Sequence, residues 1–124
     1  MFSGYRDLQV FRRAYGLALD VFEVSKAFPR DERFSLTDQV RRSSRSVAAN
    51  LAEGYRKRRY PNMMLMRFTD ADAEATETQV WLSFARDFGY LRQVQTEGLL
   101  SRYDELGRMI GAILKDPSRF GAGT

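Results

Sequence analysis

The chain has 124 residues, of which 44% are hydrophobic and 29% are charged, and its formal net charge is +4. This length and composition predict one folded domain spanning residues 1–124 rather than a disordered chain. The absence of cysteine and histidine excludes disulfides, thiolate catalysis and the commonest general base and transition-metal ligand. We therefore expect a protein that is not an enzyme and that uses no metal or cofactor.

The sequence has no stretch of the roughly 18 apolar residues that a membrane-spanning helix needs. The first residues, MFSGYRDLQVFRRAYG, carry charges every few positions, where a signal peptide would have an apolar stretch. These features predict a cytoplasmic protein without a membrane partner.

Three prolines, Pro29, Pro61 and Pro117, lie between segments whose apolar residues recur with the period of a helix, and no alternating strand pattern occurs. We expect an all-α fold with helices at about residues 7–27, 35–57, 61–88 and 94–115, followed by a flexible tail at 116–124. The connections are short, so consecutive helices should be antiparallel and form an up-down four-helix bundle.

The segment 7–27 has two apolar stripes, whereas a helix packed on one side needs only one. The first stripe consists of Leu8, Phe11, Tyr15, Ala18 and Phe22, and the second of Val10, Leu17, Val21, Val24 and Phe28. Two interpretations remain open. The helix lies deep in its own bundle, or one stripe contacts the bundle and the other contacts a neighbouring subunit, which would make the protein a homo-oligomer.

The segment 35–57 begins at a capping candidate, Ser35 or Thr37, and has an apolar side and a basic side. Its apolar side consists of Leu36, Val40, Ser43, Val47, Leu51 and Gly54. Asn50 lies near this side, so we expect it to be partly buried. Because a buried amide that finds partners fixes helix register, we predict a structural role for Asn50 and Glu53, with a ligand contact as the alternative for Asn50.

Apolar residues at steps of four and three predict the core-facing sides of the last two helices. These residues are Met64, Phe68, Ala71, Ala75, Thr78, Leu82 and Ala85 in the segment 61–88, and Leu99, Tyr103, Leu106, Ile110 and Ile113 in the segment 94–115.

Three carboxylates, those of Asp70, Glu74 and Glu77, lie on one side of the segment 61–88. Such a group can hold Mg²⁺ in a nuclease-like site, but on an exposed helix it is more often solvated or paired with basic residues. We favour ion pairing, with Arg41 or Arg45 as the partner.

The block Val40–Tyr60 holds seven of the twenty basic residues and one acidic residue, so its net charge is +6. The net charge of the whole chain is only +4, so the rest of the chain is slightly acidic. Arginine suits phosphate because its planar guanidinium donates two parallel hydrogen bonds. Tyr55 and Tyr60 flank the densest run and could stack on unpaired bases. The alternative is that a basic helix end only favours the helix dipole and solubility. The predicted nucleic-acid-binding residues are Arg41, Arg42, Arg45, Tyr55, Arg56, Lys57, Arg58 and Arg59.

The sequence resembles the 23S rRNA-intervening-sequence protein family, also called the four-helix bundle protein family, over about residues 5–114. The resemblance rests on the segments YRDLQVFRRAYGLALDVF, FPRDERFSLTDQVRRSSRSVAANLAEGY, ETQVWLSFARDFGYL and ELGRMIGAIL. It implies an up-down bundle that assembles into a ring-like homo-oligomer, with homopentamers known. Related accessory proteins of diversity-generating retroelements form similar pentamers that bind nucleic acid and a reverse transcriptase. The run Arg56–Arg59 is more basic than the family pattern requires.

The residues and the resemblance together favour a non-enzymatic homo-oligomer, a pentamer by resemblance, that binds the backbone of RNA or DNA through the basic block. The second hypothesis is a protein-interaction scaffold that docks a protein partner such as a reverse transcriptase. The third is a metal-dependent nuclease that uses Glu74 and Glu77, and it ranks last.

Overall fold

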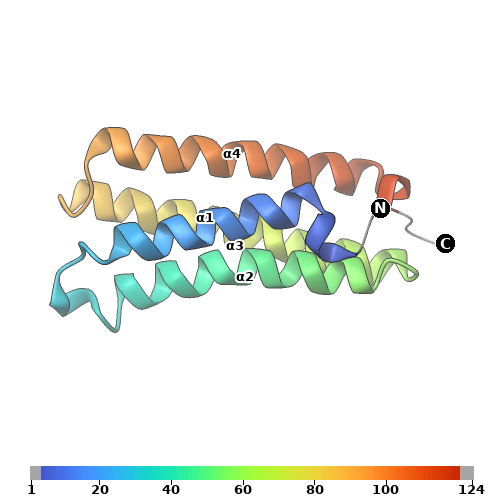
Figure 1. Ribbon diagram of the computed structural model, residues 1–124, viewed down its shortest axis with the longest axis horizontal. Helices are drawn as coiled ribbons and strands as arrows, with labels where there is room; N and C mark the ends of the chain where they lie inside the picture. Colours follow the sequence, from blue (N-terminus) through green and yellow to red (C-terminus); the bar gives the residue numbers. More distant parts are fainter. Residues whose placement is uncertain (1–3, 121–124) are drawn as a thin grey trace.

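The computed structural model describes residues 4–120, with side chains described as far as residue 118. Four long helices run up and down beside one another, which confirms the predicted all-α architecture (Figure 1). Each helix begins and ends within two residues of the predicted boundary. The helices are α1 (Gln9–Ser25), α2 (Leu36–Arg56), α3 (Pro61–Asp87) and α4 (Gln93–Lys115).

Three short 3-10 helices, η1 (Tyr5–Asp7), η2 (Arg30–Glu32) and η3 (Pro117–Phe120), flank the long ones. The predicted tail at 116–124 therefore includes a turn of 3-10 helix, and residues 121–124 lie outside the described residues. The α1–α2 and α3–α4 connections share one end of the bundle, and the α2–α3 turn lies at the other (Figure 1). Within residues 4–120, none of the helices has the length and apolar composition needed to cross a membrane.

The core lies between the predicted apolar sides of the helices. Every residue predicted to face the core from α2, α3 and α4 is buried. From α1 the core receives the second stripe, including Val10, Leu17 and Val21. The first stripe is divided: Leu8 is buried, whereas Tyr15 is 53% exposed and its neighbour Leu19 is 55% exposed. In the single chain, then, α1 has one face in the core and one apolar face that is open.

The helices α2 and α3 pack closely at Gly54. A β-carbon at this position would lie 2.5 Å from two ring carbons of Phe68. Carbon atoms in contact normally lie about 3.5–4.0 Å apart, so a side chain larger than hydrogen does not fit there. Just beyond this contact the chain turns, and Pro61 begins α3 at a position where its missing N–H costs no hydrogen bond.

The hydroxyl-bearing side chains of Ser43, Thr78 and Tyr103 are buried close together in the core. Thr78 Oγ1 lies 2.8 Å from Ser43 Oγ and 2.9 Å from the carbonyl oxygen of Glu74, so it links α3 to α2. The Tyr103 hydroxyl lies near Thr78 but has no hydrogen-bond partner of good geometry. Burial raises the pKa of Tyr103 well above its ordinary value. This group of three residues thus contains one satisfied pair of hydroxyls and one unsatisfied hydroxyl.

A junction of hydrogen bonds joins the two connections at one end of the bundle. Glu32 Oε1 accepts hydrogen bonds from the Ser35 hydroxyl at 2.6 Å and the Leu36 backbone N–H at 3.4 Å. Glu32 Oε2 accepts one from the Tyr90 hydroxyl at 2.9 Å. Glu32, rather than the predicted cap Ser35 or Thr37, therefore supplies the side-chain acceptor at the start of α2. Gly89, with φ of 83°, lets the chain leave α3 just before Tyr90.

The Glu32 junction should make stability sensitive to acid. Hydrogen bonds from Ser35 and then Tyr90 lower the pKa of Glu32 below its ordinary value of 4.5. Such a carboxyl stabilises the fold above its unfolded-state pKa, and this contribution is lost as the pH falls through the lower folded-state pKa. We expect Glu32→Gln to lower the urea midpoint at neutral pH, and the difference from wild type to shrink as the pH falls below 4.5.

The comparison with Glu32→Gln is needed because other groups titrate in the same range. Burial raises the pKa of Glu74, and a raised pKa contributes stability that is present at low pH and lost as the pH rises through it. Subtracting the variant curve from the wild-type curve, both followed by circular dichroism, isolates Glu32. A difference that stayed constant through acid pH would show that the charge of Glu32 does not matter to the junction.

Candidate nucleic-acid interface

The predicted ligands form two groups along α2. Arg41, Arg42 and Arg45 lie in its first half and are called the α2 arginines. Residues Arg56–Arg59, called the basic turn, end the helix and lead toward α3. Eleven residues, or about 16 Å of helix, separate Arg45 from Arg56. The structure therefore divides the basic block of the sequence into two separate clusters, which can be tested independently.

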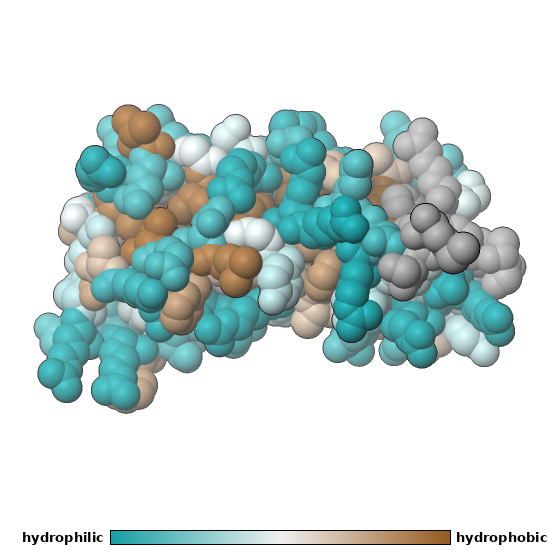
Figure 2. Space-filling model, viewed as in Figure 1, coloured by the Kyte–Doolittle hydropathy of each residue, from teal (hydrophilic) through white to brown (hydrophobic). Residues whose placement is uncertain are grey.

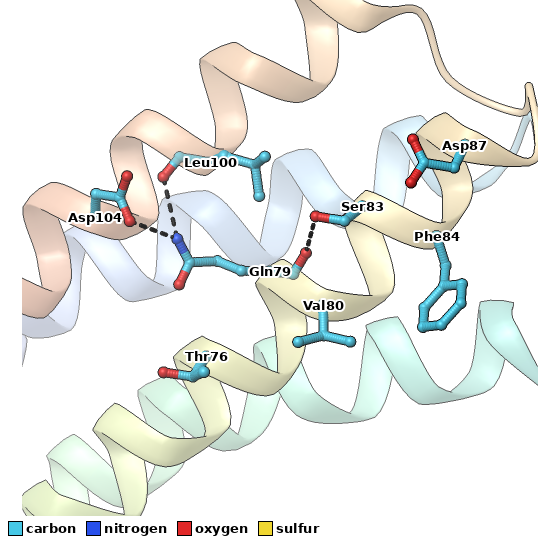
Figure 3. A pocket seen from close by; sticks show the side chains of 8 residues that line it. All are labelled: Thr76, Gln79, Val80, Ser83, Phe84, Asp87, Leu100 and Asp104. Atoms are coloured by element: carbon cyan, nitrogen blue, oxygen red, sulfur yellow. Dashed lines mark hydrogen bonds between the residues drawn. The ribbon is translucent and has the colours of Figure 1, made fainter.

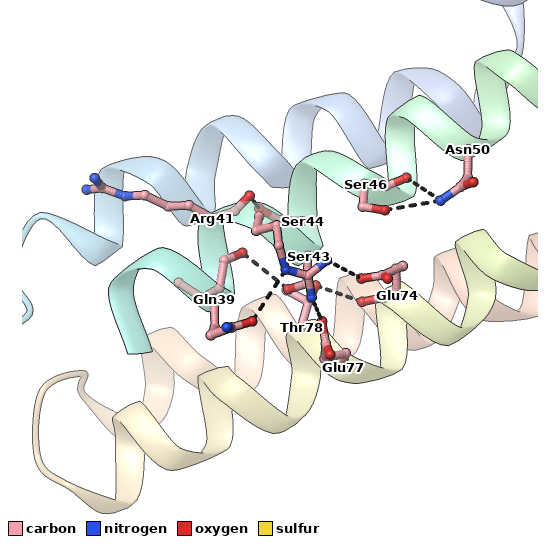
Figure 4. Close-up of polar contacts among 11 residues, drawn as sticks. Gln39, Arg41, Ser43, Ser44, Ser46, Asn50, Glu74, Glu77 and Thr78 are labelled. Atoms are coloured by element: carbon pink, nitrogen blue, oxygen red, sulfur yellow. Dashed lines mark hydrogen bonds and ion pairs between the residues drawn. The ribbon is translucent and has the colours of Figure 1, made fainter. Parts of the chain in front are cut away.

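The side chain of Arg41 is held against α1. Its Nε donates a hydrogen bond to Ser25 Oγ at 2.7 Å, and its guanidinium lies 4.5 Å from the centre of the Phe22 ring. The side chain points away from α3 (Figure 4). Because Ser25 uses only the Nε–H, the terminal Nη groups of Arg41 remain for another acceptor.

The acidic side of α3 pairs with Arg42. Arg42 Nη1 lies 3.5 Å from Glu74 Oε2, and Arg42 Nη2 binds Glu77 Oε2. Both carboxylates point toward α2 (Figure 4). The sequence favours Arg41 or Arg45 in this role, but within the chain the partner is Arg42. The reason is that Arg42 lies on the flank of α2 next to α3, whereas Arg41 turns toward α1.

A second polar group links α2 to α3 through Arg67. Arg67 Nη1 lies 3.7 Å from Asp70 Oδ2 and donates a hydrogen bond to Asn50 Oδ1 at 3.5 Å, while Arg67 Nε lies 3.6 Å from Glu53 Oε2. Asn50 Nδ2 donates to the Ser46 carbonyl oxygen at 3.0 Å (Figure 4). Asn50 and Glu53 thus contact the neighbouring helix. Across the described part of the chain, no three acidic residues are grouped to hold a metal ion.

Arg45 is exposed, and within residues 4–118 no carboxylate forms an ion pair with it. It borders two depressions. The first, the α1–α2 groove of about 420 Å³, is mainly apolar and includes Tyr15 and Leu19. The second, which we call the arginine depression, has a volume of about 550 Å³. Its lining consists of Arg33, Phe34, Thr37, Asp38 and the α2 arginines.

The basic turn lies at the end of the bundle opposite the Glu32 junction (Figure 1). Arg58 folds over Tyr55, with its guanidinium 4.3 Å from the ring centre and its Nη1 donating to the Tyr55 carbonyl oxygen at 3.2 Å. Tyr55 is 9% exposed, so a base could stack on it only if Arg58 moved. Tyr60, at 64% exposed, is the open ring beside this cluster.

Two members of the arginine depression, Arg33 and Phe34, are candidates that the sequence analysis did not select. Phe34 is 83% exposed, and the Arg33 guanidinium lies 4.9 Å from the centre of its ring. Both residues precede the first residue of α2, so the helical spacing of Arg41 and Arg45 gave no signal for them.

A further groove, of about 480 Å³, lies between α3 and α4 (Figure 3). Gln79 crosses it, with Nε2 donating to the Leu100 carbonyl oxygen at 3.3 Å and to Asp104 Oδ1 at 2.8 Å. Val80 and Phe84 are exposed on its α3 side. The polar groups at its centre bond to each other, so this α3–α4 groove presents mainly an apolar surface.

Comparison with known protein families shows to which family the chain belongs. The model of the family described as 23S rRNA-intervening sequence protein matches residues 6–112. The chain belongs to this family. Both the α2 arginines and the basic turn lie inside the matched range, as do Arg33 and Phe34. The candidate interface is therefore part of the family domain and not an appendage to it.

Among solved structures, a protein of unknown function from the S23 ribosomal protein family of Bacteroides thetaiotaomicron has a similar structure. It is 22% identical to this family member, with a TM-score of 0.78, and the match covers 86% of this chain and 98% of that one. At this identity the likeness shows the fold alone. A search of curated proteins found no match.

Proposed function

We propose that this 23S rRNA-intervening sequence protein is a cytoplasmic, non-enzymatic homo-oligomer that binds the backbone of RNA or DNA. The contacts come from the basic turn and the α2 arginines. The observation that carries the proposal is that, within residues 4–118, no carboxylate forms an ion pair with Arg45 or with any of the four residues of the basic turn. By contrast, Arg13 and Arg102 are each bound by a carboxylate at 2.6 Å.

Unpaired arginine groups favour phosphate for two reasons. They can make charge-assisted hydrogen bonds without first breaking an ion pair. Each phosphate that they neutralise also releases condensed counterions, which adds affinity at low salt. A non-catalytic role is supported by the sequence, which has no histidine or cysteine, and by Arg42 and Arg67, which hold the acidic residues of α3 in ion pairs.

Assembly into a ring of identical subunits, with five copies as the sequence resemblance implies, is part of the same proposal. It is supported by two apolar surfaces on different helices. Tyr15 and Leu19 are exposed beside the α1–α2 groove, and Val80 and Phe84 are exposed beside the α3–α4 groove. Hydrophobic side chains are visible over α1 between hydrophilic ones (Figure 2). Two different surfaces that meet head to tail close into a ring when the rotation fits.

The binding proposal predicts a large loss of affinity when the basic turn is neutralised. In the variant with Arg56, Lys57, Arg58 and Arg59 all changed to Ala, we expect at least about a tenfold weaker Kd for structured RNA at low salt. The slope of log Kd against log salt should fall by about 0.7–0.9 for each phosphate that the variant no longer binds. Fluorescence anisotropy at several salt concentrations measures both quantities.

The matched control removes the same charge from α4 and the residue before it, by changing Arg92, Arg102, Arg108 and Lys115 to Ala. Its affinity and salt slope should stay much closer to those of wild type. Equal losses in the two variants would mean that only net charge matters, and an unchanged affinity in the basic-turn variant would remove that cluster from the interface.

The oligomer proposal predicts a species of five subunits by size-exclusion chromatography with light scattering. Leu19→Glu places a charge on the open face of α1 and should dissociate the assembly, because a buried unpaired carboxylate is strongly unfavourable. Val94→Glu, at an exposed position on α4, is the control and should leave the mass unchanged. A monomeric wild-type protein at micromolar concentration would contradict the proposal.

A further inference from the structure

We propose that the arginine depression binds one unpaired nucleotide, with the Phe34 ring stacked on its base and with Arg41 and Arg45 facing its phosphate. This inference rests on the proposed nucleic-acid function. It adds a second contact at the other end of α2 and a preference for single-stranded over duplex segments.

The first argument is the exposure of Phe34. The residue lies in the connection between η2 and α2, where the chain projects from the end of the bundle (Figure 1). Burying a ring of this size is normally favourable, yet 83% of the residue faces solvent. Its contact is instead the guanidinium of Arg33, 4.9 Å from the ring centre. An exposed ring beside an arginine offers two planar groups on which bases stack.

The second argument is that phosphate ligands lie at a suitable distance from this ring. Phe34, just before the start of α2, and Arg41 and Arg45, in its first half, line the same depression, so one nucleotide can contact the ring and an arginine together. The Nη groups of Arg41 are not used by Ser25, and Arg45 has no carboxylate partner in the described residues. A base on Phe34 and its phosphate near these two arginines therefore fit one continuous surface.

The third argument concerns the size and polarity of the depression. Its volume of about 550 Å³ lies within the range of about 300–1,000 Å³ that small-ligand sites occupy. Asp38 is its one acidic lining residue, and its carboxylate can accept a hydrogen bond from a base amino group or a ribose hydroxyl. In a duplex the bases stack on each other, so only an unpaired base can reach Phe34.

The test compares full-length Phe34→Ala with wild type. The probes are fluorescently labelled single-stranded RNA, single-stranded DNA and the duplexes of the same sequence, all at one salt concentration. We expect single-strand binding to weaken about tenfold, as the loss of one stacked base does, and duplex binding to stay unchanged. Phe34→Trp should retain the affinity, and single strands should quench its added fluorescence over the Trp81 background. Val94→Ala, at an equally exposed position on α4, should have no effect.

The outcomes separate this site from the proposed function. Wild-type affinity in Phe34→Ala, together with a loss in the basic-turn variant, would overturn the nucleotide site and leave backbone binding standing. Equal losses for single strands and duplexes would overturn the stacking contact. No binding of any probe by the wild-type protein would overturn both proposals.

Discussion

Replacing Gly54 by alanine is expected to destabilise the protein by about 1–3 kcal/mol, because the added methyl group has no room. A β-carbon there would lie 2.5 Å from ring carbons of Phe68, and that ring is fully buried. Either the ring must leave its rotamer or α2 and α3 must move apart. Alanine is the better helix former by about 1 kcal/mol, so a loss of stability reports the clash and not helix propensity. Urea unfolding followed by circular dichroism measures the change.

Gly111→Ala is the matched control. No atom lies within 4 Å of a β-carbon at that position in α4, so this change should stabilise the protein by about 0.4–1 kcal/mol. Phe68→Ala gives a second test, since alone it should cost about 3–5 kcal/mol and also remove the clash. In that background Gly54→Ala should become neutral or favourable. A penalty that survived removal of the ring would show that the contact is not its cause.

The change Thr78→Val is expected to cost about 1–3 kcal/mol, although valine has nearly the same shape. Both Thr78 and Ser43 are fully buried, and their hydroxyl oxygens lie 2.8 Å apart. Without Thr78 Oγ1, the Ser43 hydroxyl keeps only a long contact of 3.4 Å to the Val40 carbonyl oxygen. A buried hydroxyl that is left nearly unsatisfied loses the hydrogen bonds it makes to water in the unfolded state and gains none in the folded protein. Thermal unfolding should therefore show a lower stability for the variant.

Two further variants test the cause of that loss. When Ser43→Ala is combined with Thr78→Val, no polar group is left unpaired at this contact, so much of the stability should return. Tyr103→Phe should be neutral or stabilising, because it removes a hydroxyl that has no partner. A loss of several kcal/mol in Tyr103→Phe would mean that this hydroxyl is bonded in solution.

Helical periodicity was sufficient to predict the core. Phe68 and Tyr103 recur at steps of three and four with their neighbours, and both are buried. Periodicity does not determine how far one helix is rotated against the next. That rotation decides which of three arginines meets Glu74, and Arg42 is not the expected one. Long side chains on adjacent flanks of one helix can be distinguished only after the packing of both helices is known.

Two aromatic residues at the candidate interface also show what helical periodicity cannot predict. Tyr55 follows Leu51 by four residues and therefore shares its buried side, but its place in a basic run suggested an open ring. Phe34 lies before the first residue of α2, where helical periodicity gives no signal. The turn that carries Phe34 is joined to the α3–α4 connection by a hydrogen bond between Glu32 and Tyr90, which are 58 residues apart in the sequence. Contacts between two connections are not encoded in any local pattern.

The Glu32 junction has a consequence for ligand binding. A flexible loop that carries a binding residue must lose conformational freedom when the ligand arrives, and this weakens binding. Three hydrogen bonds to one carboxylate already fix the turn on either side of Phe34. The turn is thus preorganised by folding itself, so Glu32→Gln should weaken single-strand binding without touching the nucleotide. Acid that protonates Glu32 should loosen the turn in the same way, which would couple occupancy of the arginine depression to pH.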